Sequence, residues 1–173
     1  MSNIRNNNIK FISVISRLFI SACCIVFLNG CVSGMAGWKG HIVKKENRIK
    51  IDKVSGKAGG VWETGDLSIK YEYVVKGDRI ELEGKIFLAD KITHFSTLDY
   101  LSVMVQFLDG EGGVAGHETL YTSSKSWFPV IRLSFSRSFV LPSKTDSISF
   151  SYSGKVSDGN GDDGIDWSFW FNP

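Results

Sequence analysis

Apolar and polar residues alternate along much of this chain, with the period of two that an extended strand requires. The alternation is clearest over 66–88, where two apolar series flank a turn at 76–78. The apolar positions are Leu67, Ile69, Tyr71, Tyr73 and Val75, then Ile80, Leu82, Ile86 and Leu88. Because charged residues occupy most positions between them, this segment is predicted to be a β-hairpin with one face in water.

Several other segments are also predicted to be strands. Residues 98–108 are apolar on both faces, as is typical of a central strand, and a glycine-rich turn at 109–113 leads into a strand at 114–121. Further strands are predicted at 48–54, 133–139, 147–152 and 166–171. About eight strands with frequent turn signals favour an all-β fold, an antiparallel β-sandwich over residues 38–173. A closed β-barrel is the alternative.

Part of this pattern resembles a known class of domain. The run 80–86 (IELEGKI), followed by 101–114 (LSVMVQFLDGEGGV), is similar to the small immunoglobulin-like modules of bacterial extracytoplasmic proteins called FxLYD domains. In those modules a strand with a central glycine precedes a strand that ends in an aromatic-x-Asp-x-Gly turn, and Phe107-Leu108-Asp109-Gly110 is similar here. The resemblance implies an immunoglobulin-like sandwich used for binding or scaffolding.

The first 31 residues differ from all that follows. They carry three basic residues and no acidic one, and an uncharged run covers 18–28 (LFISACCIVFL). A basic segment followed by a short apolar run is the pattern of a secretory signal. The run ends in Leu28, Asn29, Gly30 and Cys31, which resemble the lipobox of bacterial lipoproteins. In that family the cysteine is lipidated and the peptide before it is removed.

The lipoprotein resemblance implies a division of the chain and a location. The division is a signal peptide at 1–30, a lipidated Cys31 with a tether to residue 37, and the domain at 38–173. Val32, and not aspartate, follows the cysteine, which implies an anchor in the outer membrane instead of the inner one. The domain is expected to face the periplasm, with the cell surface as the alternative. An uncleaved membrane anchor over 18–38 is the alternative, since this whole stretch is uncharged. Cleavage would leave no cysteine pair for a disulfide.

Charge changes with the predicted cleavage. The whole chain has 20 basic and 18 acidic residues, and three of the basic ones precede residue 31. The remaining chain would hold 17 basic against 18 acidic residues, which argues against nucleic acid as a partner. Basic residues gather over 39–57, either to contact anionic lipid head groups or to form an ordinary solvated edge strand.

The loop 158–166 (DGNGDDGID) carries oxygen-bearing side chains at alternating positions, which resembles the start of an EF-hand-type calcium loop. Asp163 stands where that loop has its glycine, and Phe169 stands where it has a bidentate glutamate. The segment therefore predicts either a Ca²⁺ site, the one cofactor considered, or a solvated acidic turn. The candidate ligands are Asp158, Asn160, Asp162 and Asp166.

The chain has five tryptophans, five tyrosines and twelve phenylalanines, most of which are expected in the core. On an extended strand Trp170 faces opposite to Trp167 and Phe169, so one of the two faces is expected to be open to solvent. The candidates for stacking against a sugar or a peptide are Trp62, Trp127 and Trp170.

Motifs for catalysis are missing from the sequence. The three histidines do not have metal-ligand spacing, and there is no Gly-x-Ser-x-Gly elbow or phosphate-binding loop. We therefore expect a non-catalytic, lipid-anchored envelope protein that acts as a binding or assembly module with a protein partner in the envelope. The alternatives are a calcium-dependent ligand-binding domain and a hydrolase with an unrecognised site.

Overall fold

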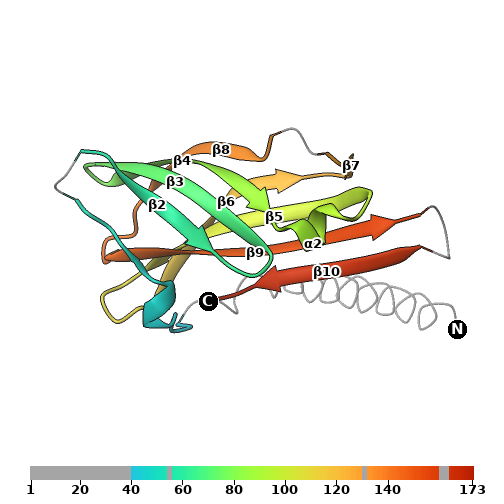
Figure 1. Ribbon diagram of the computed structural model, residues 1–173. Coiled ribbons are helices and arrows are strands. Elements are labelled where there is room, and N and C mark those ends of the chain that lie inside the picture. Colours follow the sequence, from blue (N-terminus) through green and yellow to red (C-terminus); the bar gives the residue numbers. More distant parts are fainter. Residues whose placement is uncertain (1–39, 54–55, 130–131, 160–163) are drawn as a thin grey trace, which may run out of the picture. The chain divides into compact units, whose positions relative to one another are not determined.

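Two antiparallel β-sheets pack face to face in the computed structural model (Figure 1). The structure describes residues 40–53, 56–129, 132–159 and 164–173. The predictions for the signal peptide, the lipobox with Cys31 and the tether concern positions before residue 40 and lie outside the described residues. In the described part, no helix has the length and apolar character needed to cross a membrane.

The smaller sheet has four strands in the order β2-β3-β4-β8. Their bounds are β2 (Ala58–Glu63), β3 (Leu67–Lys76), β4 (Arg79–Leu88) and β8 (Ser134–Val140). The larger sheet follows the order β1-β9-β5-β6, with β10 also paired to β9 and β7 also paired to β5. Its strands are β1 (Ile49–Lys50), β5 (Thr97–Leu108), β6 (Val114–Ser123), β7 (Ser126–Trp127), β9 (Ser147–Asp158) and β10 (Ile165–Phe171). Two short helical segments are η1 (Lys45–Asn47) and α2 (Asp90–Thr93).

Each of the two sheets pairs strands that are distant in the sequence, since β4 pairs with β8 in one sheet and β5 pairs with β9 in the other. The predicted antiparallel β-sandwich is therefore confirmed, and the sheets do not close into a barrel. Among the described residues, eight strands have six or more residues and two have only two.

The alternation over 66–88 forms the predicted hairpin. Lys76 pairs with Arg79 across a two-residue turn, in which Gly77 has a φ of 63° that glycine adopts without strain. The apolar residues of β3 and β4 point toward the larger sheet, and Ile69 and Ile80 have no solvent exposure. Alternation in the sequence therefore reports burial correctly in this hairpin.

Aromatic rings join the two sheets. Trp62 of β2 makes edge contacts with Phe150 and Phe171, with ring centroids 5.5 and 5.4 Å apart. Tyr71 of β3 contacts Phe150 at 5.3 Å. Each such pair adds about 0.5–1.5 kcal/mol beyond simple burial. Because Trp62 is only 8% exposed and surrounded by these rings, its prediction as a ligand-stacking residue is wrong.

Four strands differ from the prediction: β1 and β2, as described next, β7, which was not predicted, and β9, which extends to Asp158 instead of ending at residue 152. The strand predicted over 48–54 is reduced to β1, which pairs with the beginning of β9. Strand β2 was not predicted, because Trp62 is the single fully buried side chain in its sequence AGGVWE. Its glycines are required by close packing, since a Cβ on Gly59 would overlap the carbonyl oxygen of Tyr71.

The outer face of the larger sheet is covered at one end. Gln106 of β5 and Ser149 of β9 are opposite in register and point away from the main core, yet both are fully buried. Gln106 donates a hydrogen bond to the side chain of Asn172 (3.2 Å), and Ser149 donates one to the carbonyl of Asn47 (2.8 Å). Segments from both ends of the described chain therefore cover this part of the sheet.

A core glycine provides a test of this packing. Gly154 of β9 pairs with Phe169 of β10, whose ring occupies the space that a Cβ at residue 154 would need. We expect Gly154→Ala to lower the free energy of unfolding by about 1–3 kcal/mol, measured by urea denaturation, because the ring must shift.

Gly110→Ala is the matched control, since a Cβ there meets nothing within 4 Å. This variant should change the free energy of unfolding by less than about 0.5 kcal/mol. Equal stability of the two variants would contradict the described packing.

Candidate functional site

A cavity lies where β8 separates from β4, and we call it the β4 cavity. The two strands pair until Lys85 lies opposite Ser134, and a last backbone hydrogen bond runs from the N–H of Ile86 to the carbonyl of Leu133 (2.8 Å). Strand β4 continues to Leu88, while the chain before β8 turns away. The resulting cavity of about 1070 Å³ is at the upper end of the range for ligand-binding pockets.

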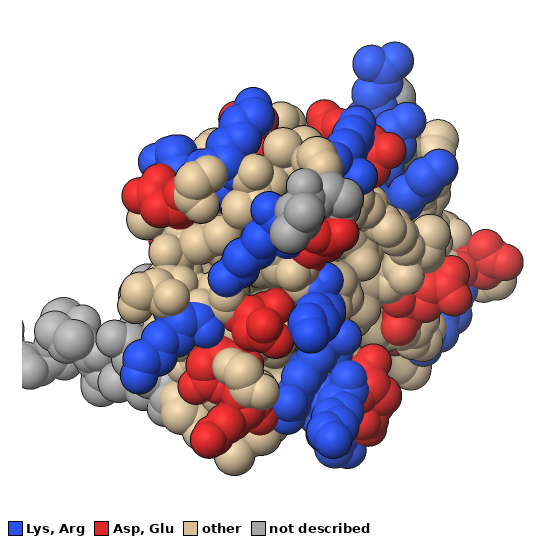
Figure 2. Space-filling view, turned by 90° about the vertical axis from the view of Figure 1, so that its left-hand side faces the viewer, with Lys and Arg blue, Asp and Glu red and all other residues tan. Residues whose placement is uncertain are grey.

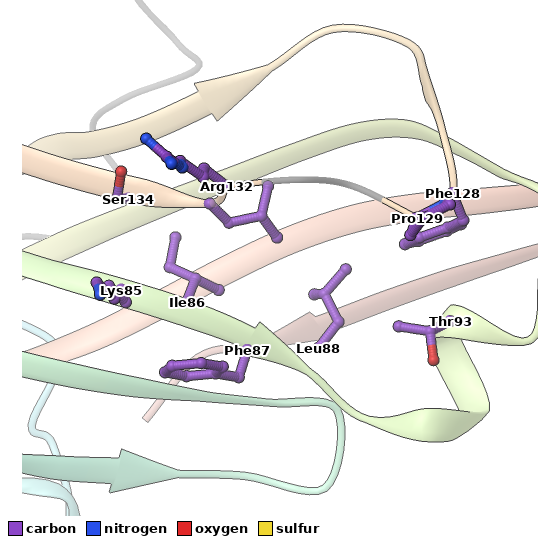
Figure 3. Close-up of a pocket in the computed structure, with 10 residues that line it drawn as sticks. Lys85, Ile86, Phe87, Leu88, Thr93, Phe128, Pro129, Arg132 and Ser134 are labelled. Carbon is purple, nitrogen blue, oxygen red and sulfur yellow. The ribbon is translucent and has the colours of Figure 1, made fainter.

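The inner wall of the β4 cavity is apolar. Figure 3 shows the side chains of Ile86 and Leu88 on one side of β4, toward the connection between β7 and β8, with Phe87 on the opposite side. Ile86 is buried and belongs to the hydrophobic core, so the inner wall is continuous with the core. The apolar residues of this wall are Ile86, Leu88, Phe128, Pro129 and Leu133.

The rim of the cavity is polar and positively charged. Its polar side chains, all exposed, are Lys85, Thr93, Arg132 and Ser134. Within the described part of the chain, neither Lys85 nor Arg132 forms an ion pair with a carboxylate. The rim therefore offers two cations and two hydroxyl groups to whatever enters the cavity.

The neighbouring row of the sheet carries paired charges of both signs, in contrast to the rim. Glu72 and Glu83 are opposite in register, and Lys57 lies between them with its ammonium group 2.8 and 3.0 Å from their carboxylates. The hydrogen bond from Lys57 lowers the pKa of Glu72, and the same bond raises the pKa of Lys57. Figure 2 likewise shows basic and acidic side chains interspersed on the face in view. Unbalanced positive charge at the rim is thus a local feature.

The described lining of the β4 cavity is apolar with hydroxyl and cationic side chains. Among the described residues that line it, there is no histidine, cysteine, aspartate or glutamate. Over the described ranges, no three His, Cys, Asp or Glu side chains are grouped to hold a metal ion. The arrangement can hold an apolar group and place a negative charge at the rim.

Two of the four predicted calcium ligands, Asp158 and Asp166, are described by the structure, and they are not brought together. Asn160 and Asp162 lie outside the described residues. Asp158 and Asp166 occupy successive pairs of the β9–β10 ladder, so their side chains point to opposite faces of the hairpin. Asp166 instead forms an ion pair with Lys155 at 2.7 Å.

The other predicted tryptophans are on the surface. Trp127 is 64% exposed and Trp170 is 72% exposed. As predicted, Trp170 faces opposite to Trp167 and Phe169, because its partner in the ladder points to the outer face.

No residue of the β4 cavity is among the site residues predicted from the sequence. The lining comes from 85–88, from Thr93, from 128–129 and from 132–134, segments that only the fold brings together. The one local signal was Pro129, which breaks the strand pattern just before β8 and indicates that the chain departs from the sheet there.

Comparisons with known proteins add no further information: no family model, no curated protein and no solved structure matches this chain. The cavity and the exposed sheet faces are therefore the features from which a function is inferred.

The Lys57 bridge yields a pH-dependent prediction. A lowered pKa means that the charged form of Glu72 is favoured in the folded state, so this stabilisation is present above the usual carboxyl value near 4.5 and is lost as the pH falls through the folded-state pKa. In Lys57→Ala, we expect the pKa of Glu72, measured by NMR titration, to rise to its usual value or above, because Glu83 then faces it without a cation.

Lys76→Ala is the control for this titration. Lys76 pairs with Glu81 at 2.8 Å in the next row, so its removal should leave the pKa of Glu72 unchanged. An unaltered Glu72 titration in Lys57→Ala would contradict the bridge.

Proposed function

We propose that this protein is a non-catalytic binding module of the cell envelope whose β4 cavity holds the apolar part of an anionic amphiphile, such as an acyl chain with a carboxylate or phosphate head. The observation that carries the proposal is the division of the cavity into an apolar inner wall and a cationic rim. An acyl chain needs no hydrogen bond from the inner wall, and its head group needs the charge that Lys85 and Arg132 supply.

The apolar part of the ligand supplies most of the affinity. Burying about 300 Å² of acyl surface contributes roughly 7 kcal/mol before the loss of translational and rotational freedom is subtracted. Ion pairs at an exposed rim contribute only about 0.2–1 kcal/mol each and are screened by salt. The contacts with the head group therefore select and orient the ligand, while burial of its acyl chain supplies the affinity.

The cell-envelope location rests on the lipoprotein resemblance of 28–31. Lipidation at Cys31 would tie the domain to the outer membrane through a tether of six residues, which reaches about 20 Å when extended. The cavity would then lie close to a surface rich in amphiphiles. The protein partner expected in the envelope would give or receive the ligand.

A fluorescent carboxylate probe, dansyl-undecanoic acid, tests the cavity in the purified protein. We expect saturable binding with one probe per chain, and we expect Lys85→Glu to weaken it about 3- to 20-fold by replacing attraction with repulsion. The methyl ester of the same probe, which has no head-group charge, should bind both proteins equally.

Lys144→Glu is the matched control for the probe titration. Lys144 is exposed beyond the end of β8 that lies away from the cavity, and its reversal changes the net charge by the same amount. Its affinity for the probe should stay within twofold of the parent. Absence of saturable binding, or equal weakening by both substitutions, would reject the proposed ligand.

The anchor is tested separately in cells. Cys31→Ser should abolish labelling by an alkyne-tagged fatty acid and release the protein from the membrane fraction, because the thiol is the group that is acylated. A membrane-bound, labelled Cys31→Ser protein would disprove the anchor and leave the cavity proposal untouched.

A further inference from the structure

The outer face of the larger sheet has a second half that stays open, away from the end buried under residues 47 and 172. We call it the open half, and it is centred on Ser153 and Lys155 of β9. Both residues are partly exposed, and they alternate with Gly154, which faces the core. Ser153, Lys155 and Ser157 of this half are partly exposed, whereas Thr97, at its far end on β5, is buried.

Three large aromatic side chains lie on the open half. Trp170, Tyr100 and Trp127 are 72%, 42% and 64% exposed. In register, Trp170 is paired with Ser153 and Tyr100 with Lys155, so both rings are on the outer side. Their partners are polar, which sets these rings apart from the aromatic side chains of the core.

Trp127 completes the series. It pairs with Thr97, and Thr97 in turn pairs with Ser157, which points to the outer face like Ser153 and Lys155. Trp170, Tyr100 and Trp127 are therefore level with positions 153, 155 and 157 of β9, respectively. They lie on β10, β5 and β7, which follow one another in the same direction across the sheet. They form one diagonal over four neighbouring strands.

A β-bulge is responsible for the middle ring. The β5–β9 ladder has a register shift between Leu98 and Tyr100, with Asp99 as the extra residue. Without it Tyr100 would share the face of Leu98, which is fully buried in the core. The bulge thus places the large aromatic side chain of Tyr100 on the surface, where it does not gain the stabilisation that burial in the core would give.

The diagonal has the dimensions of an extended oligomer. With strands about 4.8 Å apart and about 3.4 Å per residue, the Cα atoms of Trp170 and Tyr100 are about 12 Å apart, and those of Tyr100 and Trp127 about 8 Å apart. The whole line spans about 20 Å. A single small molecule would not reach from one end to the other.

The surface between the rings is polar but not strongly charged. Ser102 and Ser153 are opposite each other in register and present two hydroxyl groups beside Trp170. Lys155 is paired with Asp166 at 2.7 Å, and the hydrogen bond between them raises the pKa of Lys155. Since this cation is already matched by a carboxylate, the face does not favour an anionic ligand.

We infer that the open half is a carbohydrate-binding surface for an extended, neutral β-1,4-linked glycan. A pyranose ring has an apolar C–H face and a polar edge, which fit an exposed aromatic ring and the neighbouring serine hydroxyls respectively. An extended glycan has sugar faces along a straight line, as the diagonal requires. A protein interface of this size would instead have an apolar centre. Here the centre is polar, because it contains Ser102, Ser153 and the ion pair of Lys155.

This surface is independent of the β4 cavity, since the two share no residue. The test uses the full-length protein in detergent, with chitohexaose and cellohexaose as probes, in isothermal titration calorimetry. We expect a Kd between about 10 µM and 1 mM for at least one probe, typical of a shallow, water-exposed site. Trp170→Ala and Tyr100→Ala should each weaken binding at least fivefold.

Trp167→Ala is the matched control, because Trp167 is on the same strand and half exposed but faces the other side. It should leave the Kd within twofold of the parent. Dansyl-undecanoic acid should bind Trp170→Ala as it binds the parent, which also shows that this variant is folded. Failure of both glycans to bind, or equal weakening by Trp167→Ala and Trp170→Ala, would overturn the inference.

Discussion

The two sheets are held together by aromatic side chains that meet between them. Trp62 of the smaller sheet contacts Phe150 and Phe171 of the larger sheet, and the ring of Tyr152 is edge-on to Trp62 at 6.3 Å. Burial raises the pKa of the Tyr152 hydroxyl, which therefore stays protonated and donates to Asp66 (2.9 Å). These contacts set the distance between the two sheets.

The two proposed binding features arise from irregularities in one regular framework. The β4 cavity exists because the last hydrogen bond between β4 and the segment leading into β8 joins Ile86 to Leu133, while β4 continues to Leu88. The aromatic diagonal exists because a bulge at Asp99 turns one ring outward. Two further irregularities interrupt the β5–β6 ladder, while the β3–β4 ladder runs from Leu67 to Lys76 without a register shift. Of the two binding features, one presents an apolar interior with a charged rim, and the other presents a flat polar face with exposed rings.

The parts predicted correctly from sequence are those in which local alternation and burial coincide. In β3, every second residue from Leu67 to Tyr73 is buried, so the alternation in the sequence is sufficient to predict the strand and its buried face. Strand β2 has no such pattern, so Trp62 was assigned to a surface when it belongs to the core. The cavity and the diagonal could not be predicted, because they depend on where a partner strand ends and on one extra residue in a ladder. Neither property is encoded by residue type alone.

The pairing of β1 with β9 has a consequence for how the chain acquires its structure. Ile49 pairs with Ile148, about 100 residues later, and Ile42 forms a bridge with Gly113. Contacts of such long sequence separation require the loss of much chain entropy before they contribute stability, and β-sandwiches of this kind fold in milliseconds to seconds. Among the described strands, β1 pairs with β9 alone, so this pairing requires the closure of a loop of about 100 residues.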